Sequence, residues 1–292
     1  GYGVMLLWDV ILLYQYFPQG EKGAFLFLRW VDQFLPLAFT GLFINIGLFA
    51  HLVIMWVGPL QVQVQGLFVG APYHDVPALV AFLTILVTTV NFVVSVEVNF
   101  YPKYKNYYSL FNDKGAVGDI TQAGEEMLKV LNVELKYTAL KQLLATALAI
   151  SLGGLLLEYV PLGFNDLMEG YFRTLCVGYG IYAVANTILL LLLYFTDYKG
   201  ALAASGCFAG GTVLFTVISL FFPRVYYGFG FLTGSAVFFL IAAFRLDYYT
   251  KRLPYYILSV QPVVAREKRG KFSRLGFFLS KKLERSQNSE KI

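Results

Sequence analysis

Charge is what this sequence has least of. Lys, Arg, Asp and Glu together make up only 14% of its 292 residues, whereas hydrophobic residues make up 58%. Soluble domains carry about 25% charged residues, so a water-soluble fold could not hide this much apolar surface. The composition therefore excludes an ordinary soluble domain and indicates a protein whose main solvent is lipid.

The sequence also lacks the motifs of soluble chemistry. It contains no phosphate-binding Gly-Lys-Ser/Thr loop, no His-Glu-x-x-His zinc motif, no nucleophile elbow and no Asp-x-Asp glycosyltransferase signature. Its two cysteines, Cys176 and Cys207, fall inside apolar stretches, which favours packing over a disulfide or a metal site. We therefore expect no enzymatic activity, no metal and no cofactor.

Long apolar runs take the place of these motifs. Runs of about 20 apolar residues are long enough to cross a hydrocarbon core about 30 Å thick, and their continuity favours helices over barrel strands. We predict an all-α polytopic membrane helix bundle of about six full transmembrane helices, preceded at residues 4–16 by the end of another. The predicted spans are residues 34–57, 77–100, 140–160, 171–195, 201–222 and 225–245.

Polar segments divide the predicted chain. Residues 1–250 form the helical bundle, and residues 251–292 form a basic tail. Within the bundle, residues 101–139 form a polar connection whose second half has the spacing of an amphipathic helix. That helix either lies on the membrane surface or extends the next span into water. The alternating segment 61–65 predicts an extended loop or a hairpin, residues 272–283 a short interfacial helix, and the chain from Ser286 disorder.

The distribution of lysine and arginine predicts the orientation. These residues gather in the tail, where acids are few, and include Lys251, Arg252, Arg266, Lys268, Arg269, Lys271, Arg274, Lys281, Lys282 and Arg285. Because cytoplasmic loops retain positive charge, the C-terminus should be cytoplasmic, as should the 101–139 connection. The basic tail either binds anionic lipid or serves only as this topology signal. Because the chain begins with Gly1 rather than methionine, we expect its natural N-terminus to be missing.

Polar side chains inside the spans are the first functional candidates, because an ionisable group at membrane depth costs about 2.5 to 3.5 kcal/mol on insertion scales. His51 lies deepest, as either a hydrogen-bonded packing residue or a proton-coupling group. Glu97 is a short carboxylate that needs a partner or water. Interfacial anchoring explains the residues near span ends, which are Asp32, Arg173, Arg245 and Asp247. A hydrated path or interhelical hydrogen bonds explain the amides Asn45, Asn91, Gln142 and Asn186.

The glycine pairs and prolines in the spans indicate how the helices pack and where they begin. The pairs Gly206 with Gly210 and Gly230 with Gly234 each put two glycines on one helix face, which lets neighbouring helices approach closely. Pro36 and Pro77 lie at or just inside the predicted span starts, where a missing N–H is harmless.

Several stretches resemble the PelG family, the polytopic inner-membrane component of Pel exopolysaccharide machinery, which is related to MATE-like and polysaccharide-flippase transporters. The resembling segments occur in the family's order: GLFINIGLFAHLVIMW at 41–56, APYHD at 71–75, VEVNFYPKY at 96–104, YFTDYK at 194–199, YYGFGF at 226–231 and LDY at 246–248. The resemblance implies two six-helix bundles with both ends in the cytoplasm, of which this chain supplies the second.

The resemblance also implies functional residues. Those that match the family pattern are Asn45, Gly47, Trp56, Pro72, Tyr73, Asp75, Glu97, Phe100, Tyr101, Tyr104, Asp197, Tyr227, Gly228, Gly230 and Asp247. One departure is His51, which stands where the family typically has an acidic residue, so any shared step that needs an acid there is in doubt. The predicted candidates for the substrate path or for coupling are Asn45, His51, Asp75, Glu97, Tyr101, Asn186 and Asp247.

The resemblance implies a function in polysaccharide export. We expect a bacterial inner-membrane transporter subunit for a Pel-like exopolysaccharide of the biofilm matrix, with a wide, wet cavity lined by aromatic and polar groups. The expected partners are membrane lipid, the polysaccharide, a cytoplasmic glycosyltransferase and other membrane subunits under cyclic-di-GMP control, and no nucleic acid. The alternatives are a lipid-linked oligosaccharide flippase, a MATE-like drug exporter, or a non-transporting scaffold for a synthase complex.

Overall fold

The computed structural model describes residues 2–16, 25, 27–112, 115–159, 163–260 and 270–289. It divides into two compact units, one made of Gly1–Ala38 with Gln261–Ile292 and the other of Phe39–Val260. The second unit contains most of the apolar helices and all the candidate site residues. The functional division into a bundle at 1–250 and a tail at 251–292 stays a prediction.

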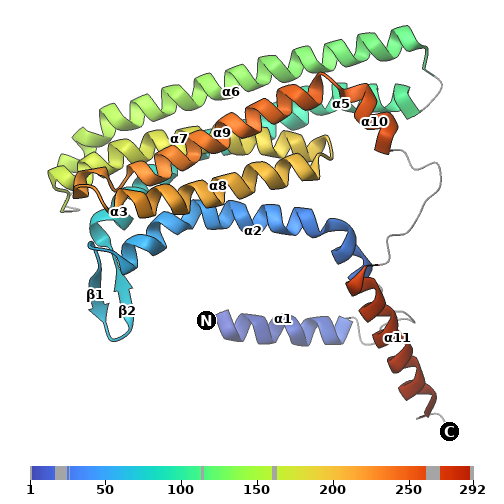
Figure 1. The fold of residues 1–292 in the computed structure, drawn as a ribbon, viewed down its shortest axis with the longest axis horizontal. Helices are drawn as coiled ribbons and strands as arrows, with labels where there is room; N and C mark the ends of the chain where they lie inside the picture. Colours follow the sequence, from blue (N-terminus) through green and yellow to red (C-terminus); the bar gives the residue numbers. More distant parts are fainter. Residues whose placement is uncertain are drawn as a thin grey trace. The chain divides into compact units, whose positions relative to one another are not determined.

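Helices make up nearly all of the described chain (Figure 1). The helices are α1 (Tyr2–Tyr16), α2 (Leu28–Val57), α3 (Pro72–Phe82), α4 (Leu86–Val94), α5 (Tyr101–Asn112), α6 (Val117–Tyr159), α7 (Asp166–Tyr194), α8 (Tyr198–Ser219), α9 (Phe229–Thr250), α10 (Leu253–Val260) and α11 (Lys271–Ser289). Short 3₁₀ turns occupy Leu83–Ile85 and Arg224–Tyr226, and a π-helical segment occupies Ser95–Phe100. Strands β1 (Val62–Gln65) and β2 (Phe68–Gly70) form an antiparallel hairpin, as the alternation at 61–65 suggested.

Five described helices are long and apolar enough to cross a membrane. They are Leu28–Val57, Pro72–Phe111, Asp166–Tyr194, Tyr198–Ser219 and Arg224–Thr250, and each contains most of one predicted span. The stretch Pro72–Phe111 runs from α3 through α4 and the π-helical segment into α5, and Arg224–Thr250 joins a 3₁₀ turn to α9. The all-α polytopic bundle is thereby confirmed. The span predicted at 140–160 is helical in α6 through Tyr159, but its final residue lies outside the described residues, as do the side chains from 154 onward.

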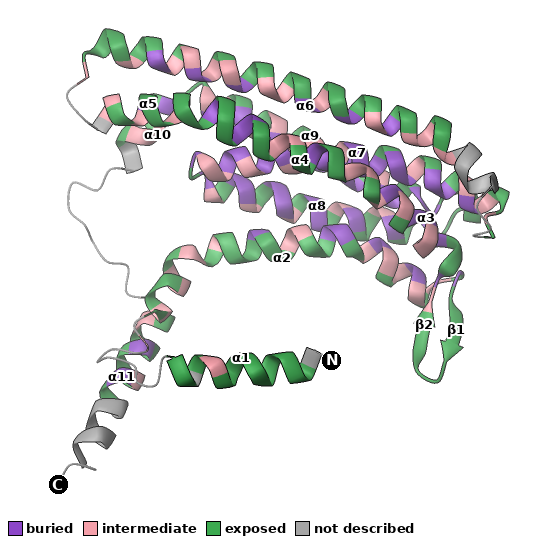
Figure 2. Cartoon of the chain, turned by 180° about the vertical axis from the view of Figure 1, so that it is seen from behind, coloured by how far each residue is buried: buried purple, intermediate pink, exposed green. Residues whose placement is uncertain are grey.

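Helix α7 forms the centre of the second unit. In its most apolar stretch 72% of the residues are buried, against 17 to 39% in the other four helices. Figure 2 shows this contrast as mainly buried positions along α7 and mainly exposed or intermediate positions along α2. Because a helix buried on all sides must be apolar all round, α7 has the pattern of a core helix, and the helices around it present their outer faces to lipid.

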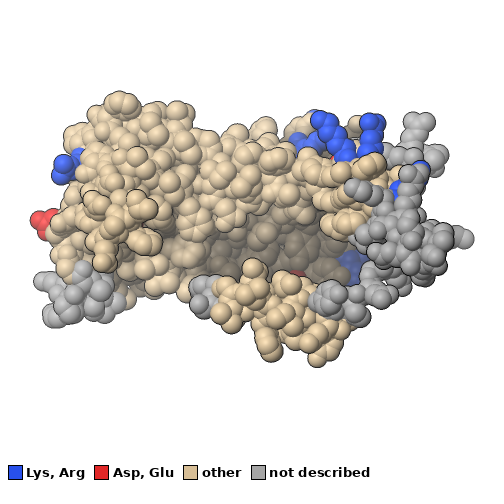
Figure 3. All heavy atoms as spheres, turned by 90° about the horizontal axis from the view of Figure 1, so that it is seen from below, with Lys and Arg blue, Asp and Glu red and all other residues tan. Residues whose placement is uncertain are grey.

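Lysine and arginine side chains are unevenly distributed on the face shown in Figure 3. On the face shown in Figure 3 most of the lysine and arginine side chains lie toward the ends of the view. The α5 and α6 helices carry several of them, and Lys103 Nζ lies 2.9 Å from Glu126 Oε2. Hydrogen bonds from Lys103 and Gln122 hold the pKa of the Glu126 carboxyl below its usual range. Since α6 is one continuous helix, the polar connection extends the span rather than forming a separate surface helix.

Helix α2 bends where proline falls inside it. The bend is at Phe34, which has φ −107° and ψ 16°, two residues before Pro36. We expected Pro36 near the first turn of a span, but α2 begins at Leu28, so the proline is internal. There its ring clashes with the carbonyl of Asp32 and a backbone hydrogen bond is lost, which bends the helix.

Helix α11 extends further toward the end of the chain than the sequence predicted. The helix predicted at 272–283 is present, since α11 begins at Lys271. It continues through Ser289, however, so disorder from Ser286 is wrong for residues 286–289, while residues 290–292 lie outside the described chain. The physical reason lies in the preceding residues: 281–285 are Lys, Lys, Leu, Glu and Arg, all of which favour helix, and a helix once formed extends easily through the next turn.

Helices α8 and α9 meet at two glycines. A Cβ atom added to Gly230 would lie 2.5 Å from Thr216 Cα, and one added to Gly234 would lie 2.8 Å from Thr212 Cα. No real Cβ fits at such distances, so both glycines permit the close approach that their spacing predicted. Gly210, of the other predicted pair, has nothing within 4 Å of its Cβ position. Only one of the two pairs therefore marks a close helix contact.

We predict that Gly234→Ala destabilises the protein by about 1 to 3 kcal/mol, because the added methyl group forces α8 and α9 apart. Gly210→Ala, which adds the same methyl group to an open position, should leave stability nearly unchanged. Thermal unfolding of both variants in detergent measures the difference. Equal midpoints would show that the contact between α8 and α9 is not tight.

Candidate functional site

The candidate residues gather at opposite ends of the second unit. One group lies near the β1–β2 hairpin, where α2 ends and α3 begins, and is called the hairpin end. The other lies where α7 ends and α8 begins, near α10, and is called the α10 end (Figure 1). Of the predicted residues, the structure places His51 and Asp75 at the first end and Glu97 and Tyr101 at the second.

A pair of histidines occupies the hairpin end. His51 of α2 and His74 of α3 have ring centroids 5.2 Å apart, and neither side chain is exposed. His51 Nε2 lies 3.2 Å from the Tyr179 hydroxyl of α7. The ring of Tyr171 lies 5.6 Å from that of His74, and the ring of Phe231 lies 4.5 Å from that of His51. These two imidazoles are the only ones in the chain, so their meeting is a specific feature of the fold.

The histidine pair is short of hydrogen bonds. Among the described residues, His51 Nδ1 and both ring nitrogens of His74 are buried without a partner. Such atoms cost free energy, and adding a proton to either ring would place a charge among aromatic side chains. The packed arrangement therefore suits two neutral rings. A charged ring would require water or an anion to reach the pair.

Asp75 lies beside this pair but bonds elsewhere. Its Oδ2 atom accepts hydrogen bonds of 2.9 Å from Trp56 Nε1 and from the backbone N–H of Ala71. The second bond satisfies a donor at the start of α3, and the first fixes the end of α2 against that start. The resemblance highlighted Trp56 and Asp75 together, and the structure joins them. Asp75 is thus a structural link within the hairpin end.

Glu97 belongs to the π-helical segment at the α10 end. Its side chain is exposed, and its Oε1 atom accepts a 2.9 Å hydrogen bond from the Tyr194 hydroxyl of α7. The Tyr104 hydroxyl donates to the backbone carbonyl of Tyr194 at 3.1 Å, and the ring of Tyr101 stacks on that of Tyr104 at 6.4 Å. An accessible carboxylate is thus set among three tyrosines. Short π-helical segments within α-helices, such as Ser95–Phe100, are frequent at functional sites.

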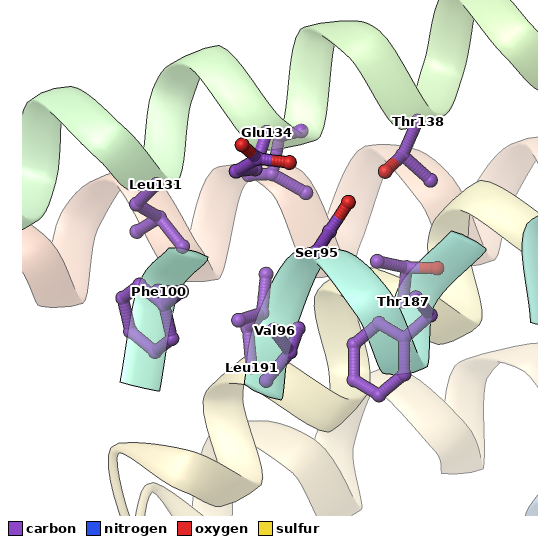
Figure 4. A pocket seen from close by; sticks show the side chains of 10 residues that line it. Ser95, Val96, Phe100, Leu131, Glu134, Thr138, Thr187 and Leu191 are labelled. Atoms are coloured by element: carbon purple, nitrogen blue, oxygen red, sulfur yellow. The ribbon is translucent and has the colours of Figure 1, made fainter. Parts of the chain in front are cut away.

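A small cavity lies behind the π-helical segment. Figure 4 shows it between Ser95, Val96 and Phe100 of that segment, Leu131, Glu134 and Thr138 of α6, and Thr187 and Leu191 of α7. Its volume is about 10 Å³, close to the space of one water molecule. The polar residues Ser95, Glu134, Thr138 and Thr187 are among those that line it, but the space is too small for a sugar, so it is no part of a substrate path.

The amides between α4 and α6 hold the helices together. Thr88 Oγ1 donates to Gln142 Oε1 at 2.5 Å, Asn91 Nδ2 donates to Thr138 Oγ1 at 2.9 Å, and Lys141 Nζ donates to Asn91 Oδ1 at 2.5 Å. Between a hydrated path and interhelical bonds, the structure favours interhelical bonds for Asn91 and Gln142.

The remaining candidates have hydrogen bonds neither to the histidine pair nor to Glu97 among the described residues. Asn45 is exposed and donates to the carbonyl of Gly41 in its own helix at 2.8 Å, and Asn186 is half-buried in α7. Asp247 pairs with Lys251 at 2.7 Å on an exposed surface, where such pairs contribute little. Their function stays a prediction.

Arg245, expected to be an interfacial anchor, has an ion-pair partner that the sequence did not reveal. Its Nε and Nη2 atoms donate to Asp197 Oδ2 and Oδ1 at 2.5 and 2.8 Å. Asp197 also caps the start of α8 by accepting from the N–H of Gly200. A bidentate pair of this kind satisfies a nearly buried carboxylate and joins α8 to α9.

A cavity of about 560 Å³ opens between α6, α7 and α9. Its wall is almost wholly apolar, with Leu143 and Ala147 from α6, Val177 and Val184 from α7, and Leu240 from α9. Sugars need hydrogen-bond partners, which such a wall does not offer, so this cavity is suited to hydrocarbon. It does not match the wet, aromatic path that we expected for a glycan, and that path stays a prediction.

The comparison with protein families decides the broader identity. A model of the PelG family, described as "Putative exopolysaccharide Exporter (EPS-E)", matches residues 1–258. The chain belongs to the PelG family. The match includes both ends of the second unit, and the predicted family resemblance is confirmed. No curated protein and no solved structure matches the chain significantly.

The sequence predicted only some of the residues that meet at the two ends of the second unit. His51 was identified by its depth in a span, whereas His74 was missed because it follows Pro72 near a span start. The rarity of histidine could have identified His74, because the chain has only two histidines in 292 residues. Tyr179 carried no signal, because tyrosine is abundant here and its partner is distant in sequence. Tyr194 opens the YFTDYK segment of the resemblance, but the sequence did not indicate its bond to Glu97.

We predict that Tyr179→Phe destabilises the protein by about 1 to 3 kcal/mol, because it leaves a buried His51 nitrogen without a partner. Tyr182→Phe is the matched control, since the Tyr182 side chain is also buried and its hydroxyl bonds to no other described residue. Thermal unfolding in detergent compares the two. If the control were destabilised as much, the bond between His51 and Tyr179 would have no special weight.

Proposed function

We propose that the chain is a membrane subunit of a transporter that exports a Pel-like exopolysaccharide across the bacterial inner membrane during biofilm matrix production. The observation that carries the proposal is the family match over residues 1–258. The five apolar helices support it, because a polar polymer crosses lipid only through a protein that spans the membrane.

We infer that the α10 end contacts the polymer. A carboxylate accepts hydrogen bonds from sugar hydroxyl groups, and tyrosine offers both an apolar face for stacking and a polar rim. Glu97 and Tyr101 are both exposed there, and Tyr194 fixes the position of the carboxylate. In this proposal the histidine pair at the hairpin end is a structural element in its packed state.

The proposed orientation places the α10 end and the C-terminus in the cytoplasm. It follows from the excess of lysine and arginine in the tail. The paired helices α5 and α6 would then project toward the cytoplasm, where a glycosyltransferase supplies the polymer. Their charged side chains, such as Lys105 and Glu125, are exposed and available to such a partner.

We predict that Glu97→Gln reduces polysaccharide export about tenfold, because a neutral amide loses a charge-assisted hydrogen bond of about 1.5 kcal/mol. Tyr194→Phe should have a smaller effect, since it frees the carboxylate without removing it. Glu125→Gln is the control, because it neutralises an exposed acid elsewhere. Secreted polysaccharide is measured in cells with equal amounts of each variant in the membrane. Unchanged export by Glu97→Gln would remove Glu97 from the mechanism.

A further inference from the structure

Helix α11 lies outside the part of the chain that the family explains. The PelG model ends at residue 258, whereas α11 begins at Lys271. The side chains of its first eleven residues are described. Its function must therefore be inferred from these side chains and from their contacts within the first unit.

Asp32 of α2 holds the first turn of α11. Its Oδ2 atom accepts hydrogen bonds from the backbone N–H and the hydroxyl of Ser273, at 2.7 and 2.6 Å. Its Oδ1 atom accepts a 3.3 Å bond from the N–H of Phe272. A carboxylate at a helix N-terminus satisfies free N–H groups and suits the helix dipole. Asp32 therefore positions α11 beside the start of the membrane-spanning helix α2. The sequence had predicted only that Asp32 anchors α2 in the lipid interface.

One face of α11 packs on that start. A Cβ atom added to Gly276 would lie 2.5 Å from the carbonyl oxygen of Phe25 and 3.3 Å from Leu28 Cβ. Ser280, four residues further on and so on the same face, is also buried. Small residues at these two positions allow the close contact. Of the other side chains described in α11, most are exposed.

A second face of α11 combines aromatic and basic side chains. Arg274, Phe277, Phe278 and Lys281 are all exposed and follow the i, i+3, i+4, i+7 spacing of a single helix face. No acidic residue occurs between Lys271 and Leu283. Exposed phenylalanines in water are unfavourable, so a face of this kind fits a surface that is both apolar and negatively charged.

Phospholipid headgroups provide that surface. Aromatic side chains are favoured at the boundary between hydrocarbon and water, and lysine and arginine are attracted to anionic lipid. Helix α2 also carries an exposed Trp30, stacked on Phe34 with ring centroids 5.5 Å apart, near its own start. We propose that the Arg274, Phe277, Phe278 and Lys281 face of α11 docks on the anionic phospholipid headgroups of the leaflet where α2 begins.

The test places a reporter on this face. Phe278→Cys is labelled with the fluorophore NBD in the full chain that carries Cys207→Ala, and the protein is reconstituted in nanodiscs. The lipid is either phosphatidylcholine alone or phosphatidylcholine mixed with phosphatidylglycerol. We expect NBD emission to shift to the blue and iodide quenching to fall several-fold in the anionic nanodiscs, and high salt should reverse both effects.

Two charge variants separate a specific face from bulk charge. Arg274→Glu with Lys281→Glu should abolish the shift. Lys129→Glu with Lys136→Glu, which reverses two exposed lysines of α6, should preserve it. The proposal is overturned if emission is the same in both lipids, or if the α6 variant abolishes the shift equally. It is also overturned if NBD is equally protected in detergent without phospholipid, because α11 would then dock on protein.

Discussion

Hydrocarbon offers no hydrogen-bond partners, and this constraint organises the structure. Backbone groups are satisfied within helices, and polar side chains must find each other across helices. Thr88 with Gln142 joins α4 to α6, and Asp197 with Arg245 joins α8 to α9. Where no partner is needed, glycine brings backbones together, as Gly234 does against Thr212. The central position of α7 follows, because a helix without charges beyond its first turns can be surrounded by others.

The two ends of the second unit differ in how their ionisable side chains are accommodated in a membrane protein. At the hairpin end, His51 and His74 are packed among aromatic rings and left partly unbonded, which makes the site costly to charge. At the α10 end, Glu97 remains accessible and is fixed by a tyrosine. A polymer of sugars needs accessible acceptors and ring faces. The α10 end supplies both, so the proposed contact with polysaccharide rests there.

Much of the fold followed from the sequence, because apolar runs and their lengths are local properties. Five of the six predicted spans, the hairpin and the contact at Gly230 and Gly234 were all predictable in this way. The partners of buried polar groups were not, since His51 and Tyr179 are 128 residues apart and Arg245 and Asp197 are 48 apart. Depth in a span identified His51 as unusual but could not name what it touches. The bend at Phe34 was missed because the start of α2 was placed six residues too late.

The central claim is that the helical stretch 72–111 crosses the bilayer once, which puts the hairpin and the start of α6 on opposite sides. Cysteines at Leu67 and Val117, whose side chains are 99% and 81% exposed, report on the two sides in a protein that carries Cys207→Ala. A membrane-impermeant maleimide added to spheroplasts should label Leu67→Cys at once and Val117→Cys only after the membrane is opened. Labelling of both from the same side would contradict the account.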